Sequence, residues 1–352
     1  MRATRGWTES SISSGRALLA TIAIPTLTAG DALADCLQSL SRQTTDAFEM
    51  VVVDNSGRGL VRRQGEAERA GARIVEMDHN TGFGAAINSV YQMSAAPYLA
   101  TLNDDAAPAP GWLAALIAAL DRNPRAGMCA SQVRLSPSDV LDSAGMLLCA
   151  DGSSKQRGHN QSPAHFSSPG EILLPSASAA LYRRAMLNET GAFDANFFLY
   201  CEDTDLGLRG QRAGWTCLYA PNALVSHRYS HSTGRVSALK AYYVERNRLF
   251  VAVKNLPLPM LLASPFVTAA RYGWHLYFLL HGTGAAARFA MESGAGWRLA
   301  WFVLKAHLAL LANLPQLLKQ RRRIARTAKL TGPEYSSLLR RHAIPARAIA
   351  EF

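Results

Sequence analysis

Three consecutive polar residues, Asn103, Asp104 and Asp105, follow the apolar run of residues 98–102. Adjacent carboxylates could hold a divalent cation beside a diphosphate, because Mn²⁺ and Mg²⁺ prefer hard oxygen ligands. Such a cation would offset the negative charge that builds up on a leaving diphosphate. The same aspartates stand before an Ala-Ala-Pro segment and are also typical of a turn or a helix cap. The sequence leaves both interpretations open.

A second group of polar residues follows two other predicted strands. Asp54 ends the valine-rich run of residues 48–54, and a glycine-rich turn with Asn80 and Gly82 leads into a helix that carries Asn88. Asp54 could accept hydrogen bonds from a base or ribose, and the turn could bring its backbone close to a phosphate or ribose. Asp54 could equally cap the next turn. The turn is not a dinucleotide fingerprint, because no G-x-G-x-x-G follows the first strand.

A third group provides a candidate base and a candidate nitrogen ligand. Glu202 and Asp203 open a short helical segment, and one of them could remove a proton from an incoming hydroxyl group. Both could instead only be acidic residues that stabilise a helix N-terminus. His227 closes the run of residues 216–227. A lone histidine there is usually structural or exposed, so it is a candidate metal ligand only together with the other groups.

The elements that must position these residues alternate along the chain. From residue 18 onward, short apolar runs alternate with helical segments, which is typical of βαβ units that build a parallel sheet. Ligands of open α/β sheets bind where the strands end. Because the polar groups stand at the ends of separate predicted strands, we expect them to line one crevice. Residues 137–170 are rich in Ser, Gly and Pro and predict a hairpin and mobile loops.

Composition narrows the class of protein. The chain has 352 residues, a formal net charge of +11 and five scattered cysteines. The charge suits anionic partners such as headgroups or diphosphates, and we expect no nucleic acid because no nucleic-acid-binding motif is present. The cysteines form no C-x-x-C pair, which predicts neither a disulfide framework nor a zinc site. Residues 1–17 are polar and lack the apolar segment of a secretory signal, so we expect a disordered lead-in and a cytoplasmic protein.

Residues 236–352 are expected to form a helical region. Its two apolar segments, residues 257–281 and 297–318, contain prolines and basic residues that are costly inside a membrane, so neither is typical of a membrane span. The second carries an apolar stripe with basic residues on another face, followed by the basic run KQRRRIARTAK. We expect peripheral contact with the cytoplasmic membrane face. Packing on the core is the equal alternative. The stripe comprises Trp297, Trp301, Leu304, Leu308 and Leu311.

Several segments between Ala20 and Asn255 form one ordered set: IAIPT, QSLSRQT, EMVVVDNS, NTGFGAAIN, LNDD, GAFDANFFLYCEDTDLGLR, AGW and YYVERNR. In order and spacing this set resembles the family 2 glycosyltransferases, in particular their rhamnosyltransferase and galactofuranosyltransferase branch. The resemblance implies the GT-A fold, an α/β domain with a mixed central sheet flanked by helices. We expect that domain over residues 18–235, with the helical region as a C-terminal extension.

The resemblance also implies roles for the polar groups. Asp203 would be the base, assisted by Glu202, while Asp105 and His227 would hold Mn²⁺ or Mg²⁺ on the donor diphosphate. Asp104 would contact the ribose or the metal. With the glycine-rich turn included, the expected donor-binding residues are Pro25, Thr26, Asp54, Asn80, Gly82, Asn88 and Asp104.

The implied reaction is a direct displacement that inverts the anomeric carbon of a dTDP- or UDP-sugar, with no enzyme nucleophile. Processive synthases carry Q-x-x-R-W, whereas residues 211–215 read QRAGW, so we expect single transfers. Our leading hypothesis is transfer of a sugar, with rhamnose as a candidate, to a lipid-linked or cell-envelope glycan. The alternative is a catalytically silent GT-A scaffold that binds nucleotide or organises a glycan-assembly complex. The sequence predicts no oligomeric state.

Overall fold

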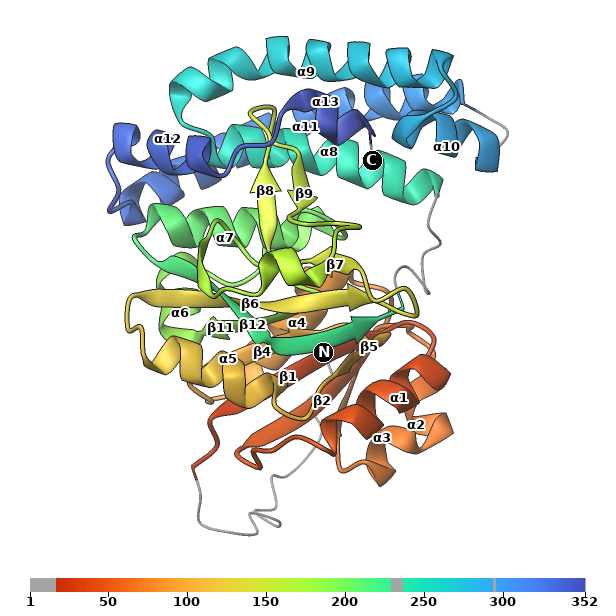
Figure 1. Ribbon diagram of the computed structural model, residues 1–352, viewed down its shortest axis with the longest axis vertical. Helices are drawn as coiled ribbons and strands as arrows, with labels where there is room; N and C mark the ends of the chain where they lie inside the picture. The colour runs from red at the N-terminus through yellow and green to blue at the C-terminus, as the bar shows by residue number, and fades with distance from the viewer. Residues whose placement is uncertain (1–16, 229–236, 294–295, 352) are drawn as a thin grey trace.

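The computed structural model describes residues 17–228, 237–293 and 296–351. The chain forms an α/β half, which contains the central sheet, and a set of C-terminal helices. These helices lie together at one end of the α/β half (Figure 1). The first half of the sheet is built from β1 (Ala20–Thr26), α1 (Asp31–Leu40), β2 (Phe48–Asp54), α2 (Leu60–Gln64), α3 (Glu66–Arg69), β3 (Arg73–Glu76), α4 (Phe83–Met93) and β4 (Tyr98–Leu102).

The following segment completes the sheet. Its elements are β5 (Ala106–Pro108), α5 (Trp112–Asp121), β6 (Ala126–Leu135), β7 (Leu141–Ser143), β8 (Met146–Leu148), β9 (Ser154–Gln156), η1 (Pro163–Phe166), β10 (Gly170–Ile172), β11 (Ala179–Arg183), α6 (Arg184–Thr190), η2 (Ala195–Phe197), α7 (Glu202–Arg212) and β12 (Thr216–His227). The predicted hairpin within residues 137–170 is the antiparallel pair β8 and β9.

The sheet is mixed, with the strand order β10-β12-β6-β11-β4-β1-β2-β3. β1 pairs in parallel with β2 and β4, and β2 with β3, as alternating strands and helices predict. β11 runs antiparallel to both β4 and β6, so the expectation of a parallel sheet fails in this half. The reason is that helical crossovers join β1 to β4, whereas β11 is reached through the β7 to β10 segment. The mixed GT-A sheet is confirmed.

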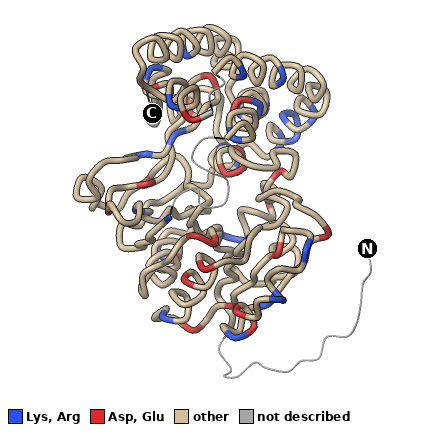
Figure 2. Tube along the Cα trace, turned by 90° about the vertical axis from the view of Figure 1, so that its right-hand side faces the viewer, with Lys and Arg blue, Asp and Glu red and all other residues tan. Residues whose placement is uncertain are grey.

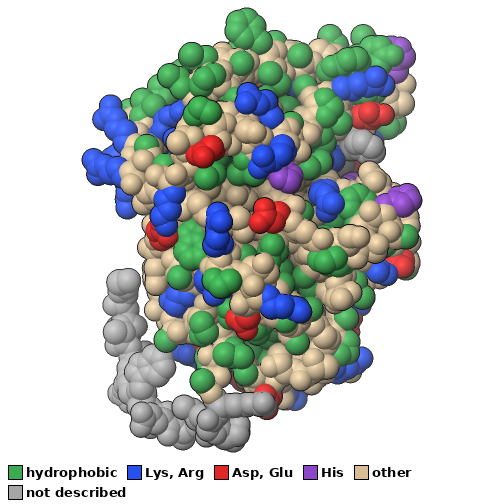
Figure 3. All heavy atoms as spheres, turned by 60° about the vertical axis from the view of Figure 1, so that its left-hand side comes forward, with side chains coloured by type: hydrophobic (Ala, Val, Ile, Leu, Met, Phe, Trp, Pro, Cys, Tyr) green, Lys and Arg blue, Asp and Glu red, His purple; other side chains and the backbone are tan. Residues whose placement is uncertain are grey.

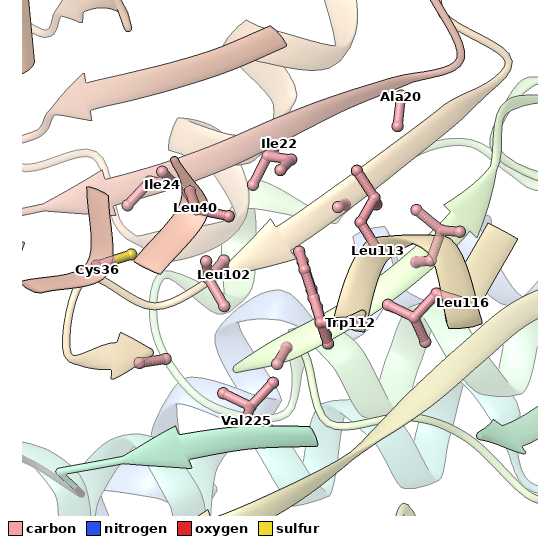
Figure 4. Packing of buried hydrophobic residues seen from close by; sticks show 14 of the residues in the cluster. Ala20, Ile22, Ile24, Cys36, Leu40, Leu102, Trp112, Leu113, Leu116 and Val225 are labelled. Atoms are coloured by element: carbon pink, nitrogen blue, oxygen red, sulfur yellow. The ribbon is translucent and has the colours of Figure 1, made fainter. Parts of the chain in front are cut away.

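Helices bury both faces of the parallel strands. On β1, Ile22 and Ile24 face a core shared with α1 and α5, whereas Ala23 faces a second core shared with α4. Figure 4 shows Trp112 of α5 beside Leu102 in the first core. The indole Nε1 of Trp112 donates a hydrogen bond of 2.8 Å to Ser131 Oγ, which satisfies its buried polar atom. Because period-two alternation fixes both faces, the strand ends that carry the polar residues are held rigidly.

The C-terminal extension packs directly on the α/β half. It comprises α8 (Ala238–Asn255), α9 (Leu258–Leu280), α10 (Gly284–Ser293), α11 (Arg298–Thr327), α12 (Gly332–Arg341) and α13 (Ala346–Glu351). A third core joins Leu208 of α7 to Phe250 of α8, Leu317 of α11 and Tyr335 of α12.

Buried ion pairs reinforce this contact. Arg271 of α9 lies 2.6 Å from Asp151, in the turn after β8, and 2.8 Å from Glu245 of α8. Arg248 also donates to Glu245, with its Nε at 3.0 Å from Oε1. The four side chains are buried. Each charge has a partner of opposite sign, which buried charges require.

The outer face of the extension is apolar. The predicted stripe on α11 is exposed, with exposed fractions of 74% for Trp297, 53% for Trp301 and 65% for Leu311. In Figure 3, hydrophobic side chains gather over the upper part of the molecule, with basic side chains at the edge. Among the described residues, α11 is the one helix that could cross a membrane by length and composition. Its Ala306, Leu317 and Ile324 are nevertheless buried against neighbouring helices.

Candidate active site

A crevice of about 1110 Å³ lies between the strand ends of the α/β half and the C-terminal extension. Its lining includes residues from each of the polar groups that the sequence singles out. Pro25 and Thr26 end β1, and the turn before α4 contributes to the same wall. The predicted site residues that line the crevice are Pro25, Thr26, Asn80, Gly82, Asp104, Asp105, Glu202, Asp203 and His227.

Asp105 and His227 form a close pair at one side of the crevice. β12 pairs antiparallel with β5, which places His227 opposite Ala106 and therefore next to Asp105. Nε2 of His227 lies 3.0 Å from Oδ1 of Asp105, and both side chains are buried. The other ring nitrogen, Nδ1, lies 2.9 Å from Oδ2 of Asp142. The imidazole is thus held between two carboxylates.

The electrostatics of this pair favour charged groups. Burial opposes the charged imidazolium, but hydrogen bonds to Asp105 and Asp142 outweigh it and raise the pKa of His227 to about 10. Burial also opposes the charge on Asp142. Hydrogen bonds from His159 and His227 overcome that effect and lower the pKa of Asp142.

The pair fits a divalent cation that also binds a substrate, because such a cation would displace the proton between Asp105 and His227 and leave a neutral imidazole as ligand. Within the described ranges, no three His, Cys, Asp or Glu side chains are arranged as a metal cage. A cation shared with a diphosphate needs only one or two protein ligands, because phosphate oxygens and water supply the others. Neighbouring ligands of an octahedral ion with bonds of about 2.1 Å lie roughly 3 Å apart, and Asp105 and His227 are 3.0 Å apart. Asp142 would orient the histidine, as carboxylates behind metal-binding histidines do.

Asp203 and Glu202 stand at the first turn of α7. Asp203 Oδ2 accepts a hydrogen bond of 3.1 Å from the backbone N–H of Ala177, and its Oδ1 accepts one of 2.6 Å from that of Thr204. Burial raises the pKa of Asp203, and these hydrogen bonds offset only part of the effect. A carboxylate with a raised pKa is a stronger base.

Glu202 has a different environment. Burial, followed by the charge of Asp203, raises the pKa of Glu202 well above its ordinary value. Its Oε2 has no hydrogen-bond partner in the part of the chain that the structure describes. A neutral Glu202 avoids a second negative charge beside Asp203, so Asp203 is the better candidate for the base.

The loop before α7 has an unusual backbone. Phe198, Tyr200 and Cys201 have φ values of 62°, 70° and 64°, a region that non-glycine residues rarely adopt. Buried Asn247 of α8 stabilises this loop, because its Nδ2 donates to the carbonyls of Phe197, Leu199 and Tyr200 at 2.7–2.9 Å. The YYVERNR segment thus supports the loop that presents Asp203.

The glycine-rich turn packs against the same loop. Gly82 has a φ of +82°, and a Cβ atom at this position would lie 2.2 Å from the carbonyl oxygen of Phe198. The adjacent N–H of Phe83 donates to that oxygen at 2.8 Å. Asn80 Oδ1 accepts from the N–H of Gly82 at 3.0 Å and from Nδ2 of Asn55 at 3.3 Å.

Two predicted donor-binding residues lie outside the crevice lining. Asp54 is at the end of β2 as predicted, but its Oδ2 accepts from the N–H of Val61 at 2.9 Å, and its Oδ1 from that of Ser56 at 3.0 Å. Asp54 therefore stabilises the turn into α2, and its neighbour Asn55 reaches the crevice. The amide of Asn88 both donates to and accepts from the backbone of Phe193. Asp54 thus binds within its own turn, whereas Asn88 joins α4 to the backbone near residue 193, and both contacts are structural.

Sequence reasoning missed several residues of the site. Asp142 lies in a Ser- and Gly-rich stretch without periodicity, and Asn55 stands beside the more conspicuous Asp54. Lys155 and His159 also line the crevice and come from the segment predicted as loops. A buried Asp in an otherwise polar stretch offers no local signal, because its partner His227 is distant in sequence.

The sequence is similar to those of known proteins. The family Glycosyl transferase family 2 matches residues 21–191. Two relatives from Mycobacterium tuberculosis, strains CDC 1551 and H37Rv, are named N-acetylglucosaminyl-diphospho-decaprenol L-rhamnosyltransferase. Each is 30% identical over 233 residues, which cover 60% of this chain and 76% of the relative.

The fold has solved counterparts. The crystal structure of GalNAc-T7 with UDP, GalNAc and Mn²⁺ has a TM-score of 0.57 and 13% identity, and covers 70% of this chain. The chain spans about half of that protein, 49% of its length. At this identity the likeness shows the GT-A fold alone. The family match and the Mycobacterium relatives show that this chain belongs to the family 2 glycosyltransferases.

Proposed function

We propose that this glycosyltransferase moves one sugar, with rhamnose as the first candidate, from a nucleoside diphosphate to a glycan on a lipid diphosphate. The observation that carries the proposal is that Asp105, His227 and Asp203 line one crevice. The Mycobacterium relatives support the sugar and the acceptor, because their name specifies rhamnose and a diphospho-decaprenol.

The donor would occupy the end of the crevice at β1 and the glycine-rich turn. Pro25 and Thr26 would contact the base of a dTDP- or UDP-sugar, and Asn80 and Gly82 would face its ribose or phosphates. Asp104, directly after β4, lines the same wall. Predicted roles for Asp54 and Asn88 in donor binding would require them to leave their present hydrogen bonds.

Asp105 and His227 would hold Mn²⁺ or Mg²⁺ on the donor diphosphate. The cation, when bound, supplies positive charge next to the leaving diphosphate. The GalNAc-T7 structure contains Mn²⁺ with UDP, which supports this choice of metal. Asp142 would keep Nε2 of His227 directed at the site, because it binds the opposite ring nitrogen.

Asp203 would act as the base. Its carboxylate takes the proton of an acceptor hydroxyl as that oxygen bonds to the anomeric carbon from the face opposite the diphosphate. The bond from that carbon to the diphosphate oxygen breaks, and the nucleoside diphosphate leaves with the electron pair. The product has the inverted configuration, and no covalent enzyme intermediate forms.

A lipid-linked acceptor requires access to a membrane. The exposed apolar faces of α9 and α11 would lie at the cytoplasmic surface, with Trp297 and Trp301 at the headgroup level. The basic run at the end of α11 would add attraction to anionic lipids. Peripheral docking agrees with the burial of the inner side of α11.

A donor and acceptor screen tests the proposal. Purified protein is incubated with Mn²⁺, a panel of dTDP-, UDP- and GDP-sugars and a membrane lipid extract, and products are identified by mass spectrometry. We expect a lipid glycan that gains one sugar from one donor. Absence of turnover with every donor would contradict the proposal and favour the silent scaffold.

A further inference from the structure

The crevice extends well beyond the donor and the base. Past Asp203 it continues along the inner sides of the C-terminal helices, where its lining includes Val244 of α8, Phe289 of α10, and Phe302 and Val303 of α11. The rings of Phe289 and Phe302 meet edge to face, with centroids 6.2 Å apart. The nucleoside diphosphate sugar does not account for this apolar wall.

Three basic side chains line the crevice between Asp203 and the apolar wall. Lys155 comes from β9, Lys240 from the first turn of α8, and Arg288 from α10. Burial, followed by the positive charges of Arg288 and Lys240, lowers the pKa of Lys155 to about 8. Their charges are therefore close enough to repel, and an anion bound between them would relieve that repulsion. Basic residues occur on several helices of the extension (Figure 2).

The strand that carries Lys155 contacts the helix that carries the proposed base. Oγ of Ser154 lies 2.7 Å from Oγ1 of Thr204, a bond that joins the residue before Lys155 to the residue after Asp203. Two acidic residues of the extension also line this part. Glu245 is bound by Arg248 and Arg271, and Glu292 lies one helical turn from Arg288.

We propose that Lys155, Lys240 and Arg288 bind the diphosphate of the lipid-linked acceptor, and that its prenyl chain runs along Phe289 and Phe302. This inference rests on the proposed function for the identity of the acceptor. The arrangement matches the order of chemical groups in such a molecule: the sugar at Asp203, the diphosphate beside it and the apolar chain beyond. The chain would leave between helices whose outer faces are apolar, as a lipid embedded in a membrane requires.

Direct binding tests this site without any turnover. The probes are farnesyl diphosphate, farnesol and inorganic diphosphate, measured by calorimetry with the full-length protein in detergent micelles. The variant K155Q/K240Q/R288Q removes the three charges. The pair R63Q/R122Q is the control, because it removes exposed charges of the α/β half outside the crevice lining. Affinity for UDP and dTDP, measured on each protein, shows that the donor end remains folded.

We expect the triple variant to bind farnesyl diphosphate at least about tenfold more weakly, because each lost contact is a charge-assisted hydrogen bond. The control pair should bind it as the wild type does. Phe302→Ala should weaken the binding of farnesyl diphosphate but not that of inorganic diphosphate. Farnesol should bind more weakly than farnesyl diphosphate to the wild type and equally to the triple variant.

Other outcomes would overturn the inference. Unchanged affinity in the triple variant, or an equal loss in the control pair, would show that these residues form no specific site. Equal affinity for inorganic and farnesyl diphosphate would show that the site binds free diphosphate, and would exclude the lipid as its ligand. Charge-dependent farnesyl diphosphate binding without sugar transfer in the screen would retain this site while rejecting the proposed function.

Discussion

Asp142 holds His227 through Nδ1 at 2.9 Å, and the opposite ring nitrogen of His227 lies 3.0 Å from Asp105. The buried carboxylate of Asp142 therefore determines both the orientation of the ring and which nitrogen faces the crevice. Its own position depends on β7, which pairs antiparallel with β6, the neighbour of β12. Asp142 thus fixes the geometry of the proposed metal site from the side of the ring opposite Asp105.

Asp142→Asn should weaken metal binding while leaving the fold intact. An amide accepts a weaker hydrogen bond from Nδ1, and loss of such a partner typically costs 10- to 100-fold in metal affinity. The Mn²⁺ concentration for half-maximal activity should rise by about this factor. Asp121→Asn is the matched control, because Asp121 bonds to Tyr98 outside the crevice. Unchanged metal dependence in Asp142→Asn would mean that His227 binds no metal.

Asp203→Asn should abolish transfer without abolishing donor binding. The amide preserves the volume, and its oxygen can still accept one of the two backbone hydrogen bonds, but it takes no proton. Loss of a general base typically costs about 100- to 10,000-fold in rate. Turnover is measured with saturating donor and acceptor, and donor affinity by calorimetry. Glu202→Gln should lose less activity, since Glu202 is expected to be neutral. Full turnover by Asp203→Asn would remove this residue from the base role.

The pH profile should show the environment of Asp203. The base must be deprotonated, so kcat/KM falls as the pH drops through the pKa of the free enzyme. Burial raises this pKa above the ordinary value of 3.8, so activity should be lost on acidification earlier than with an exposed aspartate. Donor binding, measured over the same range, separates this effect from unfolding. An acidic midpoint at or below 3.8 would contradict the assignment.

The buried ion pairs of the extension should make stability sensitive to acid. Burial opposes the charge of Glu245, but Arg271 and Arg248 overcome it and lower its pKa from 4.5 to about 2. A lowered pKa contributes stability that is present above the unfolded pKa of 4.5 and is lost as pH falls to about 2. The shift corresponds to roughly 3 kcal/mol.

Urea unfolding at a series of pH values measures this contribution. Glu245→Gln should be less stable than the wild type at neutral pH, because Arg248 and Arg271 lose a buried partner. Its free energy of unfolding should also decrease less than that of the wild type as the pH falls. A wild-type stability that stays constant across this pH window would show that Glu245 is not held as the structure describes.

Membrane docking should depend on the outer face of α11. Trp301→Lys and Leu308→Lys place charges on an exposed apolar stripe and should reduce co-sedimentation with anionic vesicles. Met93→Lys is the control, because it adds the same charge to an exposed apolar position of the α/β half. Circular dichroism checks the fold. Equal sedimentation of all variants would exclude this face as the docking surface.

Local sequence patterns predict the elements that carry the candidate site residues. Thr216–His227 is a single strand with the predicted bounds, and Glu202 opens a helix. These features depend on periodicity and on neighbours in sequence. The antiparallel direction of β11 and the position of Asp142 depend instead on pairing between distant strands, which no local pattern encodes.

Asp54 is a residue whose position the sequence predicts but whose role it does not. Its place after a buried strand is the same whether it binds a nucleotide or caps a turn, so sequence leaves both possibilities open. The structure shows the second contact directly, through the N–H of Val61. The sequence also does not predict that Lys155, Lys240 and Arg288 line one crevice, because they come from three elements that meet only in the folded chain.

Gly82 and Phe198 touch without space for a single further carbon atom. One wall of the proposed nucleotide pocket and the loop that leads to Asp203 therefore move together, held by the hydrogen bond from Phe83. If the donor and acceptor bind as proposed, a displacement on the donor side would therefore move the loop that leads to Asp203. Occupation of one substrate pocket would then alter the geometry offered to the second substrate.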